Sequence, residues 1–454
     1  MSKALFNDFN EVSAKKWKQK IQSDLKGADY NDTLITRTLE GIDIKPFYHA
    51  DDTKTEYATR SDATQWRICQ TIEVEDVKTA NQFALDSISR GAESIKFVLN
   101  TPVNTNLLLK QIDLKNIPIC FQTNFISENF VTELSQFASD SKFYLEHDII
   151  GNLAKSGNWF TDLKTDYTTL DYIIKQNSKF KSLLSIDASL YQNAGANSIQ
   201  QLAYALAHAN EYLNHFDKNN VGPYAFQFSV GTNYFIEIAK LKAFRLLWSS
   251  LTKVYTEKDI QPIIFTRPTL RNKTIYDYNT NMLRTTTECM SAILGGSDYV
   301  SNSPYDYIFH NSNEFGERIS RNQLLVLKNE SYFDKVSNPT EGAYYIETLT
   351  QQLAEKALDL FKSIEDNGGF LHQLKEGTIQ RKIKASAAKE QERFDNGKDI
   401  LLGTNKHPNT KDQMRHNLEK LPFLKQNKRK TLIEPIIQRR LAEGLEQERL
   451  NAEN

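Results

Sequence analysis

A short loop in the middle of the chain lies where a parallel barrel would hold its acid or base. The stretch LSIDASLYQNAGANSIQQLAYALAHANEYL reads as a strand, a loop and a helix, and loops that follow strands carry the catalytic residues of such barrels. Between Ala188 and Ala196, however, the loop contains no His, Asp, Glu, Lys or Arg. The residue types that most often transfer protons are therefore missing where the fold would place them.

The acid–base candidates that remain lie at the ends of two neighbouring strand-like runs. Asp187 directly precedes the loop, and Glu146 and His147 lie near the end of the run before it. Successive strand residues face opposite sides, so only one of Glu146 and His147 can face a barrel axis. If that one is His147, it could pair with Asp187 as acid and base. The reading we favour for Asp187 is a structural hydrogen bond to a neighbouring loop.

No metal site is expected from the histidines and cysteines. His208 and His215 are the closest pair among eight histidines, and they are better explained as surface or helix-capping residues than as ligands. Cys69, Cys120 and Cys289 are scattered without metal-ligand spacing. We expect them to be buried thiols in a reducing compartment.

The totals exclude several classes of protein. The 454 residues carry 56 Lys and Arg against 57 Asp and Glu, so no basic surface for nucleic acid is indicated. No apolar run approaches the roughly 20 residues of a membrane helix. The start, MSKALFNDFNEVSAKKWKQK, lacks the apolar stretch of a signal peptide. A cytoplasmic protein that contacts neither nucleic acid nor membrane is the expectation.

Short β-prone runs alternate with helical patterns along most of the chain. The pattern predicts an α/β fold, a (β/α)8 TIM-type barrel with an N-terminal helical arm and a C-terminal helical extension. An open doubly wound sheet is the rival, but no Gly-rich phosphate turn follows the first run. The eight runs are 66–72, 95–99, 117–121, 142–150, 183–187, 224–230, 262–266 and 298–302.

Three regions follow from these patterns: an arm over 1–50, the barrel over 51–345 and the extension over 346–454. The arm holds an amphipathic helix with Trp17 and Ile21 on its apolar stripe, which needs something to pack on. Ser198 with Gln201, and Thr348 with Gln351, read as capping boxes, Gly295 and Gly296 as a helix stop, and Pro435 as the start of a last helix.

Several long stretches resemble, in order, consecutive blocks of the methylmalonyl-CoA mutase family. The opening, with LKGADY and RTLEGIDIKPFY, is similar to the leading segment of the family's small (beta, non-catalytic) subunit. The matching blocks are 191–213, 230–248, 281–300, 313–323, 338–369 and 381–406.

The resemblance implies a barrel that holds an acyl-CoA, a helical linker and a separate flavodoxin-like domain that binds cobalamin. In the family, adenosylcobalamin supplies the radical with which methylmalonyl-CoA and succinyl-CoA interconvert. The family's cobalamin domain carries an Asp-x-His-x-x-Gly motif, which occurs nowhere in this sequence. We therefore expect a chain without that domain.

The chain departs from the catalytic subunit at three strand ends. A Tyr-His pair of the catalytic subunit matches Ser189 and Leu190 here, and a leucine side chain cannot donate a hydrogen bond to a thioester. The stretch 265–279 lacks the family's His and Gly-Trp, and 65–76 replaces its TIRQYAG-type stretch. No catalytic, cofactor-binding or metal-binding residue is therefore expected in this chain.

The function expected from the resemblance is that of a non-catalytic small subunit of an adenosylcobalamin-dependent isomerase, methylmalonyl-CoA mutase. Its partner would be the large catalytic subunit, in a heterodimer, and that subunit would bind the adenosylcobalamin. With no CoA arm to admit, larger side chains should fill the axis and any cavity there should be narrow. Two alternatives stay open: an acyl-CoA mutase barrel served by a separate cobalamin-binding chain, and a cobalamin-independent barrel enzyme that uses His147 and Asp187.

Overall fold

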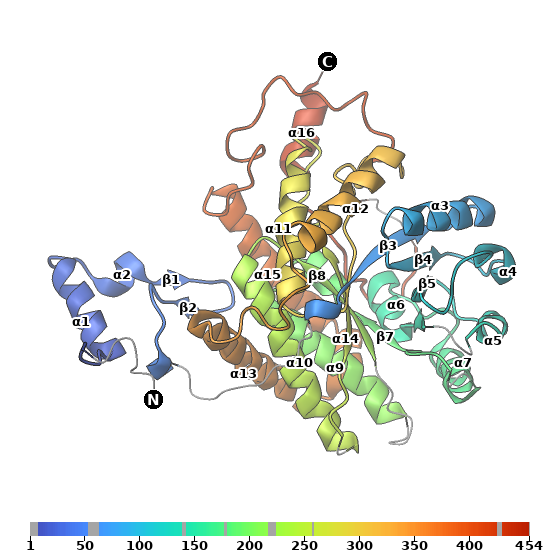
Figure 1. Ribbon diagram of the computed structural model, residues 1–454, viewed down its shortest axis with the longest axis horizontal. Helices are drawn as coiled ribbons and strands as arrows, with labels where there is room; N and C mark the ends of the chain where they lie inside the picture. Colours follow the sequence, from blue (N-terminus) through green and yellow to red (C-terminus); the bar gives the residue numbers. More distant parts are fainter. Residues whose placement is uncertain are drawn as a thin grey trace.

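Eight parallel strands form the centre of the molecule, with helices around them (Figure 1). The computed structural model describes residues 8–52, 63–138, 142–176, 179–216, 224–256, 258–424 and 429–453. The strands follow the order β6-β5-β4-β3-β10-β9-β8-β7. Their bounds are β3 Arg67–Glu73, β4 Ser94–Leu99, β5 Ile119–Thr123, β6 Phe143–Glu146, β7 Ser185–Asp187, β8 Ala225–Val230, β9 Ile263–Pro268 and β10 Tyr299–Val300.

The two ends of the sheet meet, so the sheet closes on itself. A parallel bridge joins Tyr144, in β6, to Ser182, just before β7, and the Leu145 amide donates to the Ser182 carbonyl over 2.9 Å. All eight strand runs expected from the sequence are present, and the predicted barrel is confirmed. The run 142–150 was predicted too long: Asp148 accepts a hydrogen bond from the Gly151 amide and starts a helix there.

Helices follow the strands and cover the outside of the barrel. Their order along the chain matches the alternation expected from the sequence, with short helices in several connections. The bounds are α3 Val77–Ser89, α4 Thr105–Leu108, α5 Glu128–Ser135, α6 Ile149–Ser156, α7 Leu163–Gln176, α8 Ser189–Asn193, α9 Ser198–His215, α10 Tyr234–Thr256, α11 Thr280–Leu294 and α12 Glu314–Asn329.

Strand β4 shows how the two-residue period of a strand divides the barrel wall. Ile95, Phe97 and Leu99 are fully buried and belong to a cluster with apolar residues of the surrounding helices. Lys96, between them, lies on the opposite face, toward the axis. The apolar residues thus hold the wall to its helices, and the lysine must be accommodated inside the barrel.

The axis is filled at two levels. At the lower level the Phe265 and Tyr299 rings stack with centroids 4.4 Å apart, and the Tyr299 hydroxyl donates to that of Tyr144 over 2.9 Å. Above them lies a buried ion pair, with Lys96 Nζ 2.7 Å from Glu146 Oε1. Burial disfavours the charge on Lys96, but Glu146 together with Cys120 and Cys69 outweighs this effect and raises the pKa of the lysine.

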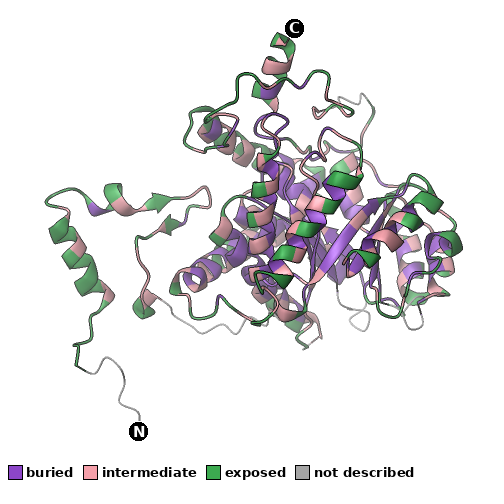
Figure 2. Ribbon diagram, turned by 45° about the horizontal axis from the view of Figure 1, so that its top comes forward, coloured by how far each residue is buried: buried purple, intermediate pink, exposed green. Residues whose placement is uncertain are grey.

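The N-terminal arm stands away from the barrel (Figures 1 and 2). It comprises α1 Ala14–Asp24, α2 Tyr30–Leu34, β1 Thr36–Arg37, β2 Asp43–Ile44 and the 3-10 turn η1 Ala50–Asp52, and a second such turn, η2 Ala63–Gln65, precedes β3. The two short strands pair antiparallel, and the hairpin residue Ile42 is buried in the main core. None of the residues of α1 is buried. The apolar stripe expected there packs only locally, with the Trp17 ring 6.1 Å from that of Phe47.

The C-terminal extension begins with three helices against α9 and α10. These are α13 Tyr344–Asp366, α14 Gly369–Lys375 and α15 Thr378–Asp395, and α16 Glu443–Ala452 ends the described chain. The predicted helix start at Thr348 is wrong, because α13 begins one turn earlier. The box predicted for α9 is shifted by one residue: Asn197 and Gln200 cap each other. The predicted stop at Gly295 and Gly296 is confirmed by the end of α11.

The last helix predicted from Pro435 is also wrong, since residues 429–442 form an irregular segment that we call the strap. Its backbone bonds to α6, to the end of α8 and to the segment after β9 instead of to itself. The amides of Ile436, Arg439 and Leu441 donate to carbonyls of Ala154, Asn193 and Arg271, over 2.7, 3.0 and 2.8 Å. Hydrogen bonds to distant segments thus replace those of a helix, which begins only at α16.

We predict that the axial ion pair is required for stability. Replacing Lys96 with Met leaves the buried Glu146 without its cation, and we expect the free energy of unfolding to fall by about 3–5 kcal/mol. The double variant Lys96→Met/Glu146→Gln should regain most of this loss, because no net charge is then buried. Urea unfolding followed by tryptophan fluorescence measures both, and a double variant no more stable than the single one contradicts the assignment.

Candidate functional site at the mouth of the barrel

The loop after β7 lies at the carboxyl ends of the strands, where barrel enzymes keep their chemistry. It enters α8 immediately, and the two positions that match the family's Tyr-His pair point in different directions. Ser189 lines the open space above the strands. Leu190 is 1% exposed and belongs to the main hydrophobic core. The aliphatic side chain therefore neither supplies a hydrogen-bond donor nor reaches the mouth.

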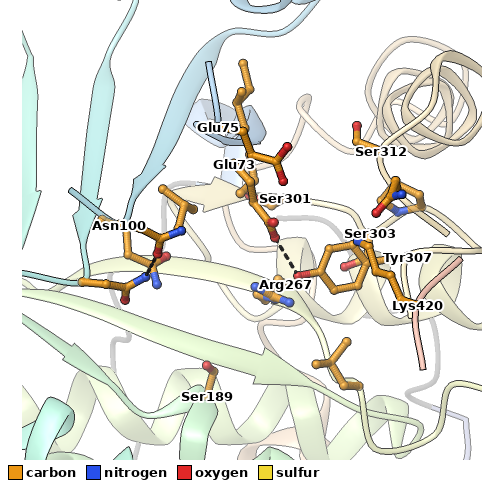
Figure 3. Close-up of a pocket in the computed structure, with 18 of the residues that line it drawn as sticks. Glu73, Glu75, Asn100, Ser189, Arg267, Ser301, Ser303, Tyr307, Ser312 and Lys420 are labelled. Carbon is orange, nitrogen blue, oxygen red and sulfur yellow. Dashed lines mark hydrogen bonds between the residues drawn. The ribbon is translucent and has the colours of Figure 1, made fainter. Parts of the chain in front are cut away.

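A cavity of about 1340 Å³ occupies the mouth (Figure 3). Its floor is formed by strand ends, its wall by residues 301–314 after β10, and part of its rim by the strap. A smaller space of about 90 Å³ lies next to it and reaches down to Lys96, Glu146 and Gln227. The expectation of a narrow cavity is therefore right within the strands and wrong at the mouth, because the positions above the strand ends are small and polar, as at Ser189 and Ser301.

His147 does not face the axis. Glu146 takes that side, accepting hydrogen bonds from Gln227 and from the Cys120 thiol. The His147 ring is 2% exposed, its Nδ1 lies 2.9 Å from Thr123 Oγ1, and its Nε2 is buried with no hydrogen-bond partner. Burial lowers the pKa of His147 to about 3. The predicted pairing of His147 with Asp187 is therefore not found.

Asp187 plays the structural part favoured from the sequence. Its Oδ1 accepts from the amide and the hydroxyl of Ser189, which fixes the start of α8. Its own amide donates to Asp148 Oδ2 over 3.0 Å. Asp187 lines both cavities, so its carboxylate borders the mouth while it is held by the loop.

The two histidines of α9 differ from each other. His215 lies in the last turn of α9 and is exposed, with its Nε2 3.0 Å from Asp171 Oδ1, as expected for a surface histidine. His208 was expected at the surface, which is wrong: it is fully buried, with Nε2 2.9 Å from Asp148 Oδ1 and Nδ1 2.9 Å from the Tyr191 hydroxyl. The Asp148 carboxylate lies inside the barrel wall, and its contact with His208 holds the imidazole there.

The cysteines are free and buried, as predicted. Among the residues that the structure describes, no group of three or more His, Cys, Asp or Glu is arranged to hold a metal ion. None of the helices in the same part of the chain is both long and apolar enough to cross a membrane.

The cations of the mouth were not predicted from the sequence. Arg267 lies two residues after Phe265 in β9, on the same inward face, and lines both cavities. Lys420, from the extension, approaches the same space. Both lie beside the Tyr307 ring, with the Arg267 Cζ 5.8 Å and the Lys420 Nζ 5.5 Å from its centroid. The two-residue alternation in PIIFTRP could have predicted that Arg267 faces the barrel axis. No local sequence pattern predicts that Lys420 lies at the mouth.

Comparison with known proteins decides the family. The profile described as methylmalonyl-CoA mutase matches residues 99–450. The chain belongs to the methylmalonyl-CoA mutase family. It is 34% identical, over 89% of its length, to the methylmalonyl-CoA mutase small subunit of Porphyromonas gingivalis, and it covers 71% of that protein. The family resemblance drawn from the sequence is confirmed.

This chain covers a smaller share of two other mutases of the family. The methylmalonyl-CoA mutase of Cereibacter sphaeroides is 26% identical over 86% of this chain, and the human mitochondrial enzyme is also 26% identical over 86%. The chain covers 64% and 60% of these two proteins. In general, the mutase family consists of cobalamin-dependent isomerases.

We predict that His147 makes the fold sensitive to acid. The unfolded chain takes up a proton at His147 as the pH falls through about 6.5, whereas the folded chain does not until about 3. Stability from this residue is complete above pH 6.5 and is lost as the pH falls, by about 2 kcal/mol between pH 7 and pH 5. Urea unfolding at both pH values should show that His147→Gln loses about that much less than the natural chain.

The matched control is His416→Gln, because His416 is exposed. It should leave the pH dependence unchanged. If His147→Gln also leaves it unchanged, His147 titrates normally in the folded chain and the assignment fails.

Proposed function

We propose that this chain is a non-catalytic small subunit of an adenosylcobalamin-dependent methylmalonyl-CoA mutase, supporting the large catalytic subunit that interconverts methylmalonyl-CoA and succinyl-CoA. The observation that carries the proposal is Leu190. It matches the family's proton-donating histidine, and its side chain is buried in the core, away from the mouth. A thioester carbonyl at the mouth would meet no hydrogen bond from this position.

The filled axis supports the same proposal. An acyl-CoA held along the barrel would need room between the strands, and Tyr144, Phe265 and Tyr299 occupy that room. Removing them from their mutual contacts would expose apolar rings and break the hydroxyl pair between the two tyrosines. The scaffold of a mutase barrel is thus present, while the passage a CoA ester would use is closed.

The residues at the mouth do not fit cobalamin. Among the described residues, His310 is the histidine that lines the cavity, and both its ring nitrogens are engaged: Nδ1 lies 3.0 Å from Asp306 Oδ2, and Nε2 lies 2.9 Å from the Asn417 carbonyl. A histidine that ligates cobalt needs one free nitrogen. We therefore place adenosylcobalamin in the partner subunit and derive no step through it in this chain.

The same observations weigh against the two alternatives. A mutase barrel served by a separate cobalamin-binding chain would need a donor at Leu190 and an open axis. A cobalamin-independent enzyme would need His147 at the mouth, and that ring is enclosed in the wall. Turnover by the purified chain with a cobalamin-binding chain would favour the first alternative over our proposal.

The N-terminal arm is the surface that we propose for the partner. Phe9 and Trp17 are 75% and 52% exposed, although residues of this size are normally covered. We place the resulting heterodimer in the cytoplasm. We also keep the division into an arm over 1–50, a barrel over 51–345 and an extension over 346–454 as part of this proposal.

We predict that the chain alone neither turns over nor binds the mutase ligands. In isothermal titration, micromolar adenosylcobalamin and succinyl-CoA should give no saturable heat with the purified chain. Mixed with a catalytic large subunit of the family, it should co-elute in size-exclusion chromatography, and mutase activity should appear only in the mixture. Turnover or saturable cobalamin binding by the chain alone contradicts the proposal.

We predict that the arm contributes to pairing. Trp17→Ala removes a large exposed ring that contributes nothing to the barrel core, and the dissociation constant for the catalytic subunit should rise about tenfold or more. Thermal unfolding of the isolated chain should stay unchanged. Val254→Ala is the control, since Val254 is 77% exposed on α10; an equal effect of both variants would rule out the arm as the docking surface.

A further inference from the structure

Arg267 is a cation at the mouth without a carboxylate partner. Among the described residues, no hydrogen bond or ion pair forms at its guanidinium, and its Nε is buried without an acceptor. The guanidinium lies over the face of the Tyr307 ring. A guanidinium presents five donors, and leaving them without acceptors in a partly enclosed space is costly. The side chain therefore lacks an acceptor that a ligand could supply.

A second cation lies beside the same ring. Lys420 Nζ is within 5.5 Å of the Tyr307 centroid, and no ion pair is found for it in the described chain. The Tyr307 hydroxyl donates to Glu73 Oε1 over 3.1 Å, which fixes the ring between the two cations and holds that carboxylate at the far end of the phenol. Figure 3 draws Arg267, Tyr307 and Lys420 together in the cavity.

The carboxylates that border the cavity are mostly engaged elsewhere. Most of them accept hydrogen bonds from their own neighbourhood, and among the described residues none forms an ion pair with Arg267. Asp187 is held by Ser189, Asp306 by His310 and Asn313, and Glu317 by Gln70 and Ser312. The positive charge of Arg267 thus stays available inside a cavity that has the volume for a small molecule.

The charge of the lining limits the class of ligand. Eight carboxylates and four Lys or Arg side chains border the cavity. A polyanion such as a CoA ester would be repelled by this excess of acids, whereas a single oxyanion directed at Arg267 would not. Carboxylate and phosphate groups both match the planar fork of a guanidinium.

We propose that the mouth binds a small organic acid, with its carboxylate or phosphate group on Arg267 beside Tyr307. This site goes beyond the proposed function, because it requires neither turnover nor a partner. Arg267 belongs to the stretch 265–279 that departs from the catalytic subunit. The barrel that has lost its proton donor would thus keep a ligand site of different chemistry.

Titration of the full chain with sodium succinate and with inorganic phosphate, at constant ionic strength set by chloride, tests this site. We expect saturable binding of at least one of the two probes, and Arg267→Gln should weaken it about tenfold or more. The probe that binds more tightly identifies the group as carboxylate or phosphate. Absence of saturable binding for both, or unchanged binding in Arg267→Gln, overturns the proposal.

Lys155→Gln is the matched control, because Lys155 also lines both cavities but is exposed at the rim. It changes the net charge by the same amount and should alter the dissociation constant of the probe less than twofold. An equal loss of affinity in both variants would show that binding depends on overall charge and not on Arg267, and would overturn the site. Should Arg267→Gln fail to fold, phenylglyoxal modification of the natural chain replaces it. The bound probe should protect Arg267 from the reagent, as read by mass spectrometry, and absence of protection overturns the site. Mutase activity, measured separately, bears on the proposed function alone.

Discussion

The ion pair between Lys96 and Glu146 on the barrel axis is the interaction that the rest of the architecture depends on. Two opposite charges with 6% and 3% exposed side chains are tolerable only because they meet at 2.7 Å and share Gln227. Their position fixes which face of β4 and β6 points inward. Once Glu146 is inside, His147 must be outside, and the acid–base pair that its sequence position suggested cannot form.

The barrel is closed along its axis and open at its mouth. Aromatic rings and the ion pair exclude a long ligand from between the strands, whereas the loops above leave a large space with a free guanidinium. The closed axis belongs to the scaffold of the barrel, whereas the open mouth is the part that offers space for a ligand. The wall needs only apolar side chains that face the helices. The positions that face the axis can therefore hold either packing groups or binding groups. Family membership therefore describes the wall better than it describes the mouth.

Much of the fold could be predicted because its signals are local. A run such as IKFVL, with Lys96 between buried Ile95 and Phe97, predicts a strand with two different faces, and eight such runs predict a closed barrel. The strap could not be predicted in this way. Its apolar residues Ile437 and Leu441 have helical spacing, yet the amides of Ile436 and Leu441 bond to α6 and to the segment after β9, far away in sequence, which no local pattern records.

The sequence by itself determined the order of strands and helices, the family, and the loss of a donor at Leu190, because each depends on residue type and near neighbours. Only the tertiary structure decided that Leu190 is turned into the core, that Glu146 and not His147 faces the axis, and that Arg267 and Lys420 share one tyrosine ring. These facts depend on which segments meet after the barrel closes. Whether charges from distant segments pair depends on the folded structure, and Arg267 is left without a carboxylate partner among the described residues only because of how those segments meet.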